Sequence, residues 1–213
     1  MKSLAFLITC YLSSLQAVLT GEAGLKELLE GNQRFATGKT IHSKHRESWQ
    51  GDGSETSQTP FAIVLGCSDS RVSPEIIFDQ NLGDLFIVRV AGNIAGPIEV
   101  ASIEYAASQL NSSLILVLGH ENCGAVTAVV EGKAKDIEPI ASLIEPAVKK
   151  ALKKSGDRIE NSIRENVIRT VGKLQKHPAL KPLVDKQKLL IKGGYYDLHT
   201  GKVEILVTDT PKK

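Results

Sequence analysis

The sequence has 213 residues, which fits one large domain better than two small ones. Hydrophobic residues make up 42% and charged residues 23%, so a wholly disordered chain and a collagen-like repeat are excluded. The net charge is only +2 and aromatic residues are only 5%, which argues against nucleic acid as a partner. A chain of this length folds without needing a metal or a disulfide, so a bound metal is expected to serve chemistry.

The first twenty residues differ in character from the rest. Lys2 is followed by an apolar stretch, Leu4–Leu12, then by small and polar residues, and the first acidic residue is Glu22. This order is typical of a secretory signal peptide, and the apolar stretch is too short for a transmembrane helix. We therefore expect residues 1–20 to be a signal peptide, with Ala17 nearest to a cleavage site. The protein is then exported, periplasmic or secreted, with no stable membrane anchor. The alternative is a cytoplasmic protein whose N-terminal segment is an amphipathic helix that docks on a partner subunit.

Residues 22–213 are expected to form a single catalytic α/β domain. Continuous apolar runs, typical of strands buried on both faces, predict strands at 61–66, 85–90 and 114–119, with later strands at 189–191 and 203–207. Helices are predicted at 24–35, 99–110, 124–131, 139–154 and 159–176, and a polar loop at 37–59. Strands that alternate with helices predict a mostly parallel central β-sheet flanked by helices, with an N-terminal helical arm.

The first and third predicted strands end in side chains suited to metal chemistry. Cys67, Asp69 and Arg71 follow the first strand, and His120 and Cys123 follow the third. Because function in such sheets lies at the carboxyl ends of the strands, these side chains are expected at one edge. Two thiolates and an imidazole suit tetrahedral zinc, and three protein ligands with one open position are typical of a catalytic site. We predict one Zn2+ per chain, held by Cys67, His120 and Cys123.

Asp69 and Arg71 lie two residues apart, beside the first predicted ligand. A guanidinium fork can hold a carboxylate by both oxygens, which keeps the carboxylate ionised and fixes its direction. Asp69 could then accept a hydrogen bond from zinc-bound water, or could serve as the fourth zinc ligand in a closed state. Each of these features alone has an ordinary structural explanation. Their conjunction at the ends of two separate strands is what indicates a catalytic zinc site.

Other interpretations are open on the residues alone. A disulfide between Cys67 and Cys123 would leave His120 and the Asp69–Arg71 pair unexplained. A cysteine hydrolase that uses Cys67 with His120 would need no metal. A non-catalytic zinc-binding module would hold the ion without any use for the Asp69–Arg71 pair.

The segments 67–71 (CSDSR) and 120–125 (HENCGA) resemble the paired signature of the β-class carbonic anhydrases. The resemblance covers nearly all of the chain after the leader, including RVAGN at 89–93, SIEYA at 102–106 and GGYYD at 193–197. It implies a β-carbonic anhydrase-like fold, with the metal on the three predicted ligands and Asp69 with Arg71 as the catalytic dyad. It also implies a homodimer or a tetramer, with the N-terminal helix wrapping its neighbour.

The resemblance further implies a reaction, the reversible hydration of carbon dioxide to bicarbonate and a proton by zinc-bound hydroxide, with the Asp-Arg dyad orienting the zinc water. Zinc lowers the pKa of bound water toward ~7, and two thiolate ligands should weaken this effect, so we expect activity to favour alkaline pH. The alternatives are hydrolysis of carbon disulfide or carbonyl sulfide on the same zinc site, and a non-catalytic zinc-binding homologue. An allosteric subset of the family has a tryptophan where this chain has Val64, so we expect Asp69 to stay paired with Arg71 at neutral pH.

Overall fold

The computed structural model describes residues 19–42 and 57–206, so most of the predicted leader and much of the predicted polar loop lie outside the described residues. A five-stranded sheet has the order β2-β1-β3-β4-β5. Its strands are β1 (Ala62–Gly66), β2 (Leu85–Arg89), β3 (Leu114–His120), β4 (Leu190–Tyr196) and β5 (Val203–Leu206). β1 pairs in parallel with β2 and β3, and β3 with β4, whereas β5 is antiparallel to β4. The predicted mostly parallel sheet is confirmed.

Helices flank this sheet, as predicted. They are α1 (Gly21–Ala36), α3 (Pro74–Ile77), α4 (Pro97–Gln109), α5 (Gly124–Val130), α6 (Glu138–Ala151), α7 (Arg158–Gln175) and α8 (Lys181–Asp185), with 3-10 turns η1 (Ala91–Asn93) and η2 (Lys135–Ile137). The sequence did not predict α3 and α8, because helices of four or five residues are too short to show a helical periodicity. Among the described residues, no helix is long and apolar enough to cross a membrane.

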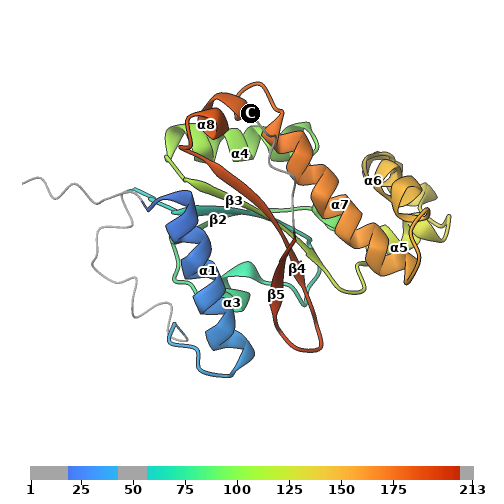
Figure 1. Cartoon of the computed structure of the whole chain (residues 1–213), viewed down its shortest axis with the longest axis horizontal. Helices are drawn as coiled ribbons and strands as arrows, with labels where there is room; N and C mark the ends of the chain where they lie inside the picture. Colours follow the sequence, from blue (N-terminus) through green and yellow to red (C-terminus); the bar gives the residue numbers. More distant parts are fainter. Residues whose placement is uncertain (1–18, 43–56, 207–213) are drawn as a thin grey trace, which may run out of the picture.

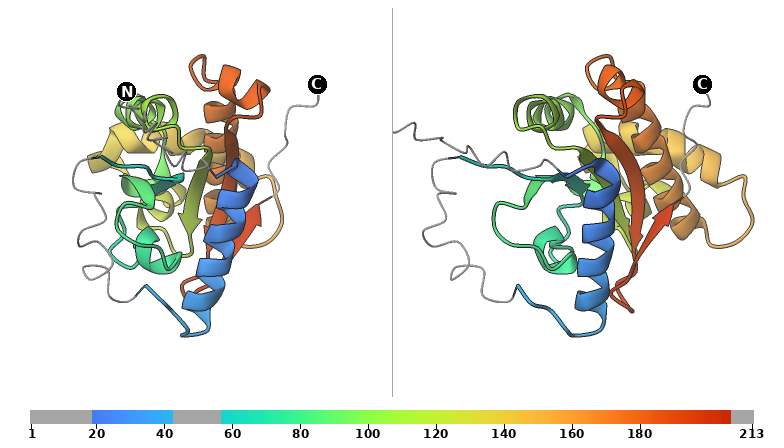
Figure 2. Two further views of the ribbon diagram at one scale, coloured as in Figure 1. Left: turned by 90° about the vertical axis from the view of Figure 1, so that its left-hand side faces the viewer. Right: turned by 60° about the vertical axis from the view of Figure 1, so that its left-hand side comes forward.

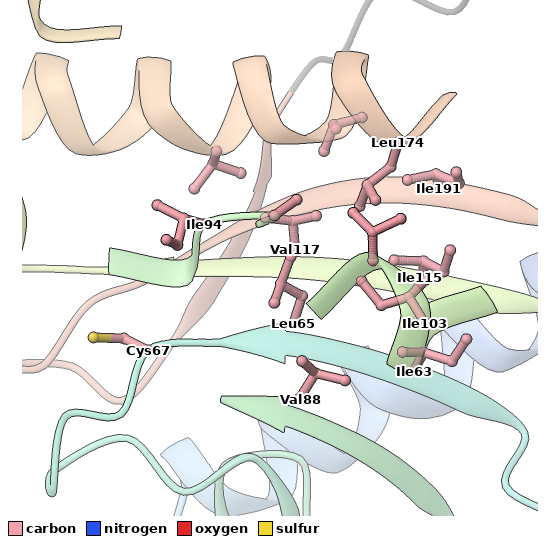
Figure 3. Close-up of a cluster of buried hydrophobic side chains, with 14 of the residues drawn as sticks. Ile63, Leu65, Cys67, Val88, Ile94, Ile103, Ile115, Val117, Leu174 and Ile191 are labelled. Carbon is pink, nitrogen blue, oxygen red and sulfur yellow. The ribbon is translucent and has the colours of Figure 1, made fainter. Parts of the chain in front are cut away.

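Helices lie on both faces of the sheet (Figures 1 and 2), and each face has an apolar core. α1 and α3 cover one face, where Leu28 packs in one cluster with Val64. α4 and α7 cover the other face, where Ile103 and Leu174 join Leu65 in a second cluster (Figure 3). α6 packs against α7. Successive strand residues point to opposite faces, so β1 and β3 are buried along their whole length only because both faces are covered.

β2 differs from its prediction. Its apolar run predicted a strand buried on both faces, but β2 lies at the edge of the sheet and Leu85, Phe86 and Ile87 stay partly exposed. An edge strand has a neighbour on one side only, so its other side leaves backbone N–H and C=O groups for solvent or for a partner. The apolar run therefore predicted the strand correctly and its burial wrongly.

α1 is anchored to the sheet through Asn32, which is 4% exposed. The Nδ2 group of Asn32 donates to the carbonyls of Ile77, at 3.2 Å, and Gly201, at 2.9 Å. Its Oδ1 accepts from the N–H of Val203 at 2.8 Å. One buried amide therefore joins α1 to α3 and to the chain between β4 and β5.

Candidate metal centre

The predicted metal ligands converge at one edge of the sheet. Cys67 directly follows β1, His120 is the last residue of β3, and Cys123 caps the start of α5. Their exposed fractions are 5%, 0% and 0%, and their ligand atoms all lie within 4.8 Å of one another. Figure 3 shows Cys67 at the margin of the apolar cluster, with its sulfur directed away from it. The convergence expected from parallel neighbouring strands is confirmed.

The chain makes a tight turn between His120 and Cys123. Asn122 adopts a φ of 52°, in the left-handed region that asparagine tolerates better than most residues. Just before the turn, a Cβ at Gly119 would lie 2.5 Å from Cγ2 of Val167, so α7 packs directly on the end of β3. The turn thus brings Cys123 back toward His120, next to the end of β3 on which α7 packs.

The His120 ring is oriented to bind a metal. Its Nδ1 donates to the carbonyl of Glu121 at 2.8 Å, which leaves Nε2 as the unprotonated nitrogen. Nε2 is buried and has no hydrogen-bond partner among the described residues. The sulfurs of Cys67 and Cys123 lie 4.0 Å apart, near the separation of about 3.8 Å that two thiolates adopt on tetrahedral zinc. Both the donor set and the unpartnered nitrogen fit a zinc ion.

The two thiols differ in acidity because they share one hydrogen bond. The hydrogen bond with Cys123 lowers the pKa of Cys67 to about 4, although burial opposes this shift, and the N–H of Gly92 adds to the lowering. The hydrogen bond with Cys67, together with burial, raises the pKa of Cys123. One thiolate therefore forms readily, and a cation between the sulfurs would stabilise the second.

Asp69 is paired with Arg71 at the boundary between the buried ligands and solvent. Arg71 donates from Nε to Oδ1 at 2.9 Å, from Nη2 to Oδ2 at 2.7 Å, and from its backbone N–H to Oδ1 at 3.0 Å. The side-chain hydrogen bonds of Arg71 hold the pKa of Asp69 well below its usual range, against the effect of burial. Oδ2 of Asp69 lies 3.8 Å from Nε2 of His120. An ionised, oriented carboxylate thus faces the metal ligands.

Arg89 supports this arrangement through the backbone. It is the last residue of β2, and it donates from Nε to the carbonyl of Cys67 at 2.9 Å and from Nη2 to the carbonyl of Asp69 at 2.6 Å. It therefore fixes the turn that carries both a ligand and the carboxylate. Sequence reasoning did not assign this role, although the position of Arg89 at the carboxyl end of a neighbouring strand was a usable signal.

The chain is similar in sequence to known carbonic anhydrases. The family model for carbonic anhydrase matches residues 62–203, which include every site residue described above. A carbonic anhydrase of Mycolicibacterium smegmatis is 36% identical over 190 residues, covering 86% of this chain and 92% of that protein. Carbonic anhydrase 2 of Mycobacterium tuberculosis is 36% identical over 187 residues, covering 84% of this chain and 90% of that protein.

Solved structures share the fold. The β-carbonic anhydrase CcaA superimposes with a TM-score of 0.67 at 29% identity, covering 85% of this chain and 94% of that one. The Coccomyxa β-carbonic anhydrase, solved with acetazolamide, gives a TM-score of 0.69 at 28% identity and covers 86% of both chains. One of two tetrameric β-carbonic anhydrases of Sordaria macrospora is similar in fold, with a TM-score of 0.67 at 22% identity, covering 87% of this chain and 98% of that one. The chain belongs to the β-class carbonic anhydrases, the zinc enzymes that interconvert carbon dioxide and bicarbonate.

Proposed function

We propose that carbon dioxide is hydrated at the edge where β1 and β3 end, with Cys67, His120 and Cys123 as the zinc ligands. The observation that carries this proposal is the convergence of three buried ligand atoms, one of them an unpartnered imidazole nitrogen, beside the Asp69–Arg71 pair. A zinc ion held there supplies Lewis acidity, lowering the pKa of a coordinated water toward about 7. The protein side chains decide how that water and the substrate meet.

Asp69 is the proposed hydrogen-bond acceptor of the reaction. Its low pKa keeps it ionised at neutral pH, so it accepts a hydrogen bond and donates none. Both of its oxygens are held by Arg71, so a water molecule beside the ligands must turn one O–H toward Asp69 and a lone pair toward the carbon atom of the substrate. Arg71 acts through Asp69 and is therefore a positioning residue.

We also propose that the protein self-associates as a homodimer or a dimer of dimers. The outer side of α1 has a shallow groove, lined by Leu25 and Leu29 among charged side chains. On the other side of the sheet, no strand of the described part of the chain pairs with the outer edge of β2, and Ile98 and Tyr105 of α4 are 76% and 49% exposed. Exposed apolar strips rimmed by charge are typical of interfaces, and an unpaired edge strand favours pairing with a second copy.

We propose that the N-terminal segment is an export leader and that it is removed, leaving a periplasmic or secreted enzyme. The support is the order of Lys2, the apolar stretch after it and the small residues around Ala17. Cleavage after Ala17 would keep Leu19 and Thr20, and both make contacts in the fold. The Leu19 carbonyl accepts from Oγ of Ser113, and Oγ1 of Thr20 caps α1 by accepting from the N–H of Ala23 at 3.3 Å.

Replacing Cys123 by serine should remove zinc and carbon dioxide hydration together, because a hydroxyl group is a much weaker zinc donor than a thiolate. The measurements are zinc content by mass spectrometry and stopped-flow hydration at neutral and alkaline pH. The matched control is Ser142→Ala, at an exposed hydroxyl group on α6 that is not one of the three ligands, and it should keep both properties. A Cys123→Ser protein with full zinc and full hydration would contradict the ligand assignment.

Asp69→Asn should keep the zinc and lower kcat for hydration by about 10²–10⁴-fold, the usual contribution of a positioned acid–base group. Arg71→Ala should act in the same direction, because it leaves the carboxylate free to rotate. Asp185→Asn is the matched control, since Asp185 is an exposed carboxylate paired with Lys181 in α8, and it should hydrate at the wild-type rate. Zinc-loaded Asp69→Asn with wild-type kcat would exclude the proposed role.

Sedimentation velocity should find the wild-type protein as a dimer or tetramer. Leu29→Glu should shift it toward smaller species, because a carboxylate would be buried in the proposed α1 interface. Leu152→Glu, at the 43% exposed residue that follows α6, is the control for a new surface charge and should not change the distribution. A wild-type protein that sediments as a monomer at micromolar concentration would refute the self-association.

Intact-mass analysis of the protein isolated from its native host should show a chain that begins near Val18, because the leader is expected to be cut at Ala17. Cell fractionation should recover the same species outside the cytoplasm. A protein that retains Met1 and Lys2 and fractionates with cytoplasmic enzymes would overturn the export proposal in favour of a cytoplasmic enzyme.

A further inference from the structure

We infer that Asn166, in the middle of α7, is a positioning residue for the metal centre. It holds the backbone of Gly92 so that the Gly92 N–H stays directed at the sulfur of Cys67. This inference deepens the proposed function and rests on it, because it requires Cys67 to be a zinc ligand.

Two buried hydrogen bonds connect α7 to the first ligand. Nδ2 of Asn166 donates to the carbonyl of Gly92 at 2.8 Å, and Asn166 is 1% exposed. The N–H of Gly92 donates to Sγ of Cys67 at 3.3 Å. The residues of the two bonds lie 74 and 25 positions apart in the sequence, so the connection exists only in the folded chain. Gly92 is thus held at its carbonyl by α7 and reaches the ligand with its N–H.

Gly92 needs such an external anchor because of its own conformation. Its φ is +75°, in the left-handed region, and a Cβ there would lie 2.7 Å from Cδ1 of Ile144 on α6. Glycine is therefore required at this position, and glycine has the least restricted backbone of all residues. The side chain of Asn166 supplies the restriction that residue 92 lacks.

The Gly92 N–H differs from the other N–H groups near the two sulfurs in its distance along the sequence from the sulfur it contacts. The N–H groups of Ala125 and Val126 lower the pKa of Cys123, and the N–H of Asp69 lowers that of Cys67. Those groups lie within three residues of the sulfur they serve, so the local turns place them. The N–H of Gly92 comes from another part of the chain, so it is the one that a distant side chain can control.

A hydrogen bond to a thiolate draws negative charge away from the sulfur and fixes its direction. Charge-assisted bonds of this kind are about twice as strong as neutral ones. Groups that hydrogen-bond to metal ligands change metal affinity or activity by about 10–100-fold when they are removed. Asn166 would therefore influence the metal through Gly92 and Cys67 without touching the metal or the substrate.

The test compares Asn166→Asp with Asn32→Asp in the zinc-loaded protein. Ionised Asp has the shape of Asn but no donor, so Asn166→Asp removes the bond to Gly92. The measurements are made at alkaline pH, because a protonated carboxyl group would donate its O–H to the same carbonyl. Competition with a chromophoric chelator should show zinc affinity about 10–100-fold lower than wild type. In the cobalt-substituted variant, the sulfur-to-cobalt charge-transfer band should move to longer wavelength, because a sulfur with a weaker hydrogen bond gives up electron density more easily.

Asn32→Asp is the matched control. Asn32 is also buried and also donates from Nδ2 to backbone carbonyls, but it lies on α1, across the sheet from α7. This variant should lose stability while keeping wild-type zinc affinity and the wild-type cobalt spectrum. If Asn32→Asp changes both readouts as much as Asn166→Asp does, the effect is general destabilisation and the inference is wrong.

An Asn166→Asp protein with wild-type zinc affinity and an unshifted cobalt band would overturn the inference while leaving the proposed function intact. A wild-type protein without zinc would overturn both. If Asn166→Asp does not fold, Asn166→Ser replaces it, because its shorter side chain also loses the direct bond. The wild-type protein loaded with cadmium-113 offers a further check. Coupling between the metal and the Gly92 amide proton supports the N–H···S bond, and its absence overturns the inference.

Discussion

The parallel pairing of β1 with β3 is the constraint on which the rest of this site depends. It sets Gly66 opposite Leu118, so that the chain leaves β1 into Cys67 just where β3 reaches His120. Because parallel neighbours end at the same edge, a short turn after each strand is enough to bring three ligand atoms within 4.8 Å of one another. A strand between them, or an antiparallel pairing, would have sent the ligands apart.

The helices on the two faces of the sheet decide how far each side chain at these strand ends is buried. They cover both faces of the sheet, so His120 and Cys123 are fully buried, and the unpartnered Nε2 of His120 is kept from water. The Asp69–Arg71 pair sits at the boundary, with side chains 15% and 52% exposed. Buried sulfur and nitrogen ligands suit tight binding of a cation. A charged pair that is open to solvent suits the exchange of small molecules. The reaction therefore depends on the depth of each side chain as much as on its chemistry.

Much of the fold and the site could be predicted from local patterns. The apolar runs at 61–66 and 114–119 correspond closely to β1 and β3, and the amphipathic run at 159–176 to α7. The predictions that were wrong have physical causes. The predicted burial of β2 was wrong, because an apolar run does not say whether helices or another copy of the chain cover the strand. β4 continues to Tyr196, well past the predicted 189–191, because pairing with β3 and β5 stabilises a Gly-Gly-Tyr-Tyr segment with little strand pattern of its own.

The side chains that could bind the metal, and the strand ends on which they lie, were predictable from residue type and apolar runs, because both are properties of short stretches of sequence. The sequence also indicated Asp69 with Arg71, since two residues of separation let a guanidinium reach a carboxylate. Tertiary structure alone decided the state of these groups. Backbone carbonyls and N–H groups accept or donate the hydrogen bonds that matter here. They set the tautomer of His120 and hold Arg89 against the turn at Cys67. They also connect Asn166 through Gly92 to the sulfur of Cys67. The positions of these backbone groups follow from the packing of distant segments, which no short stretch of sequence encodes.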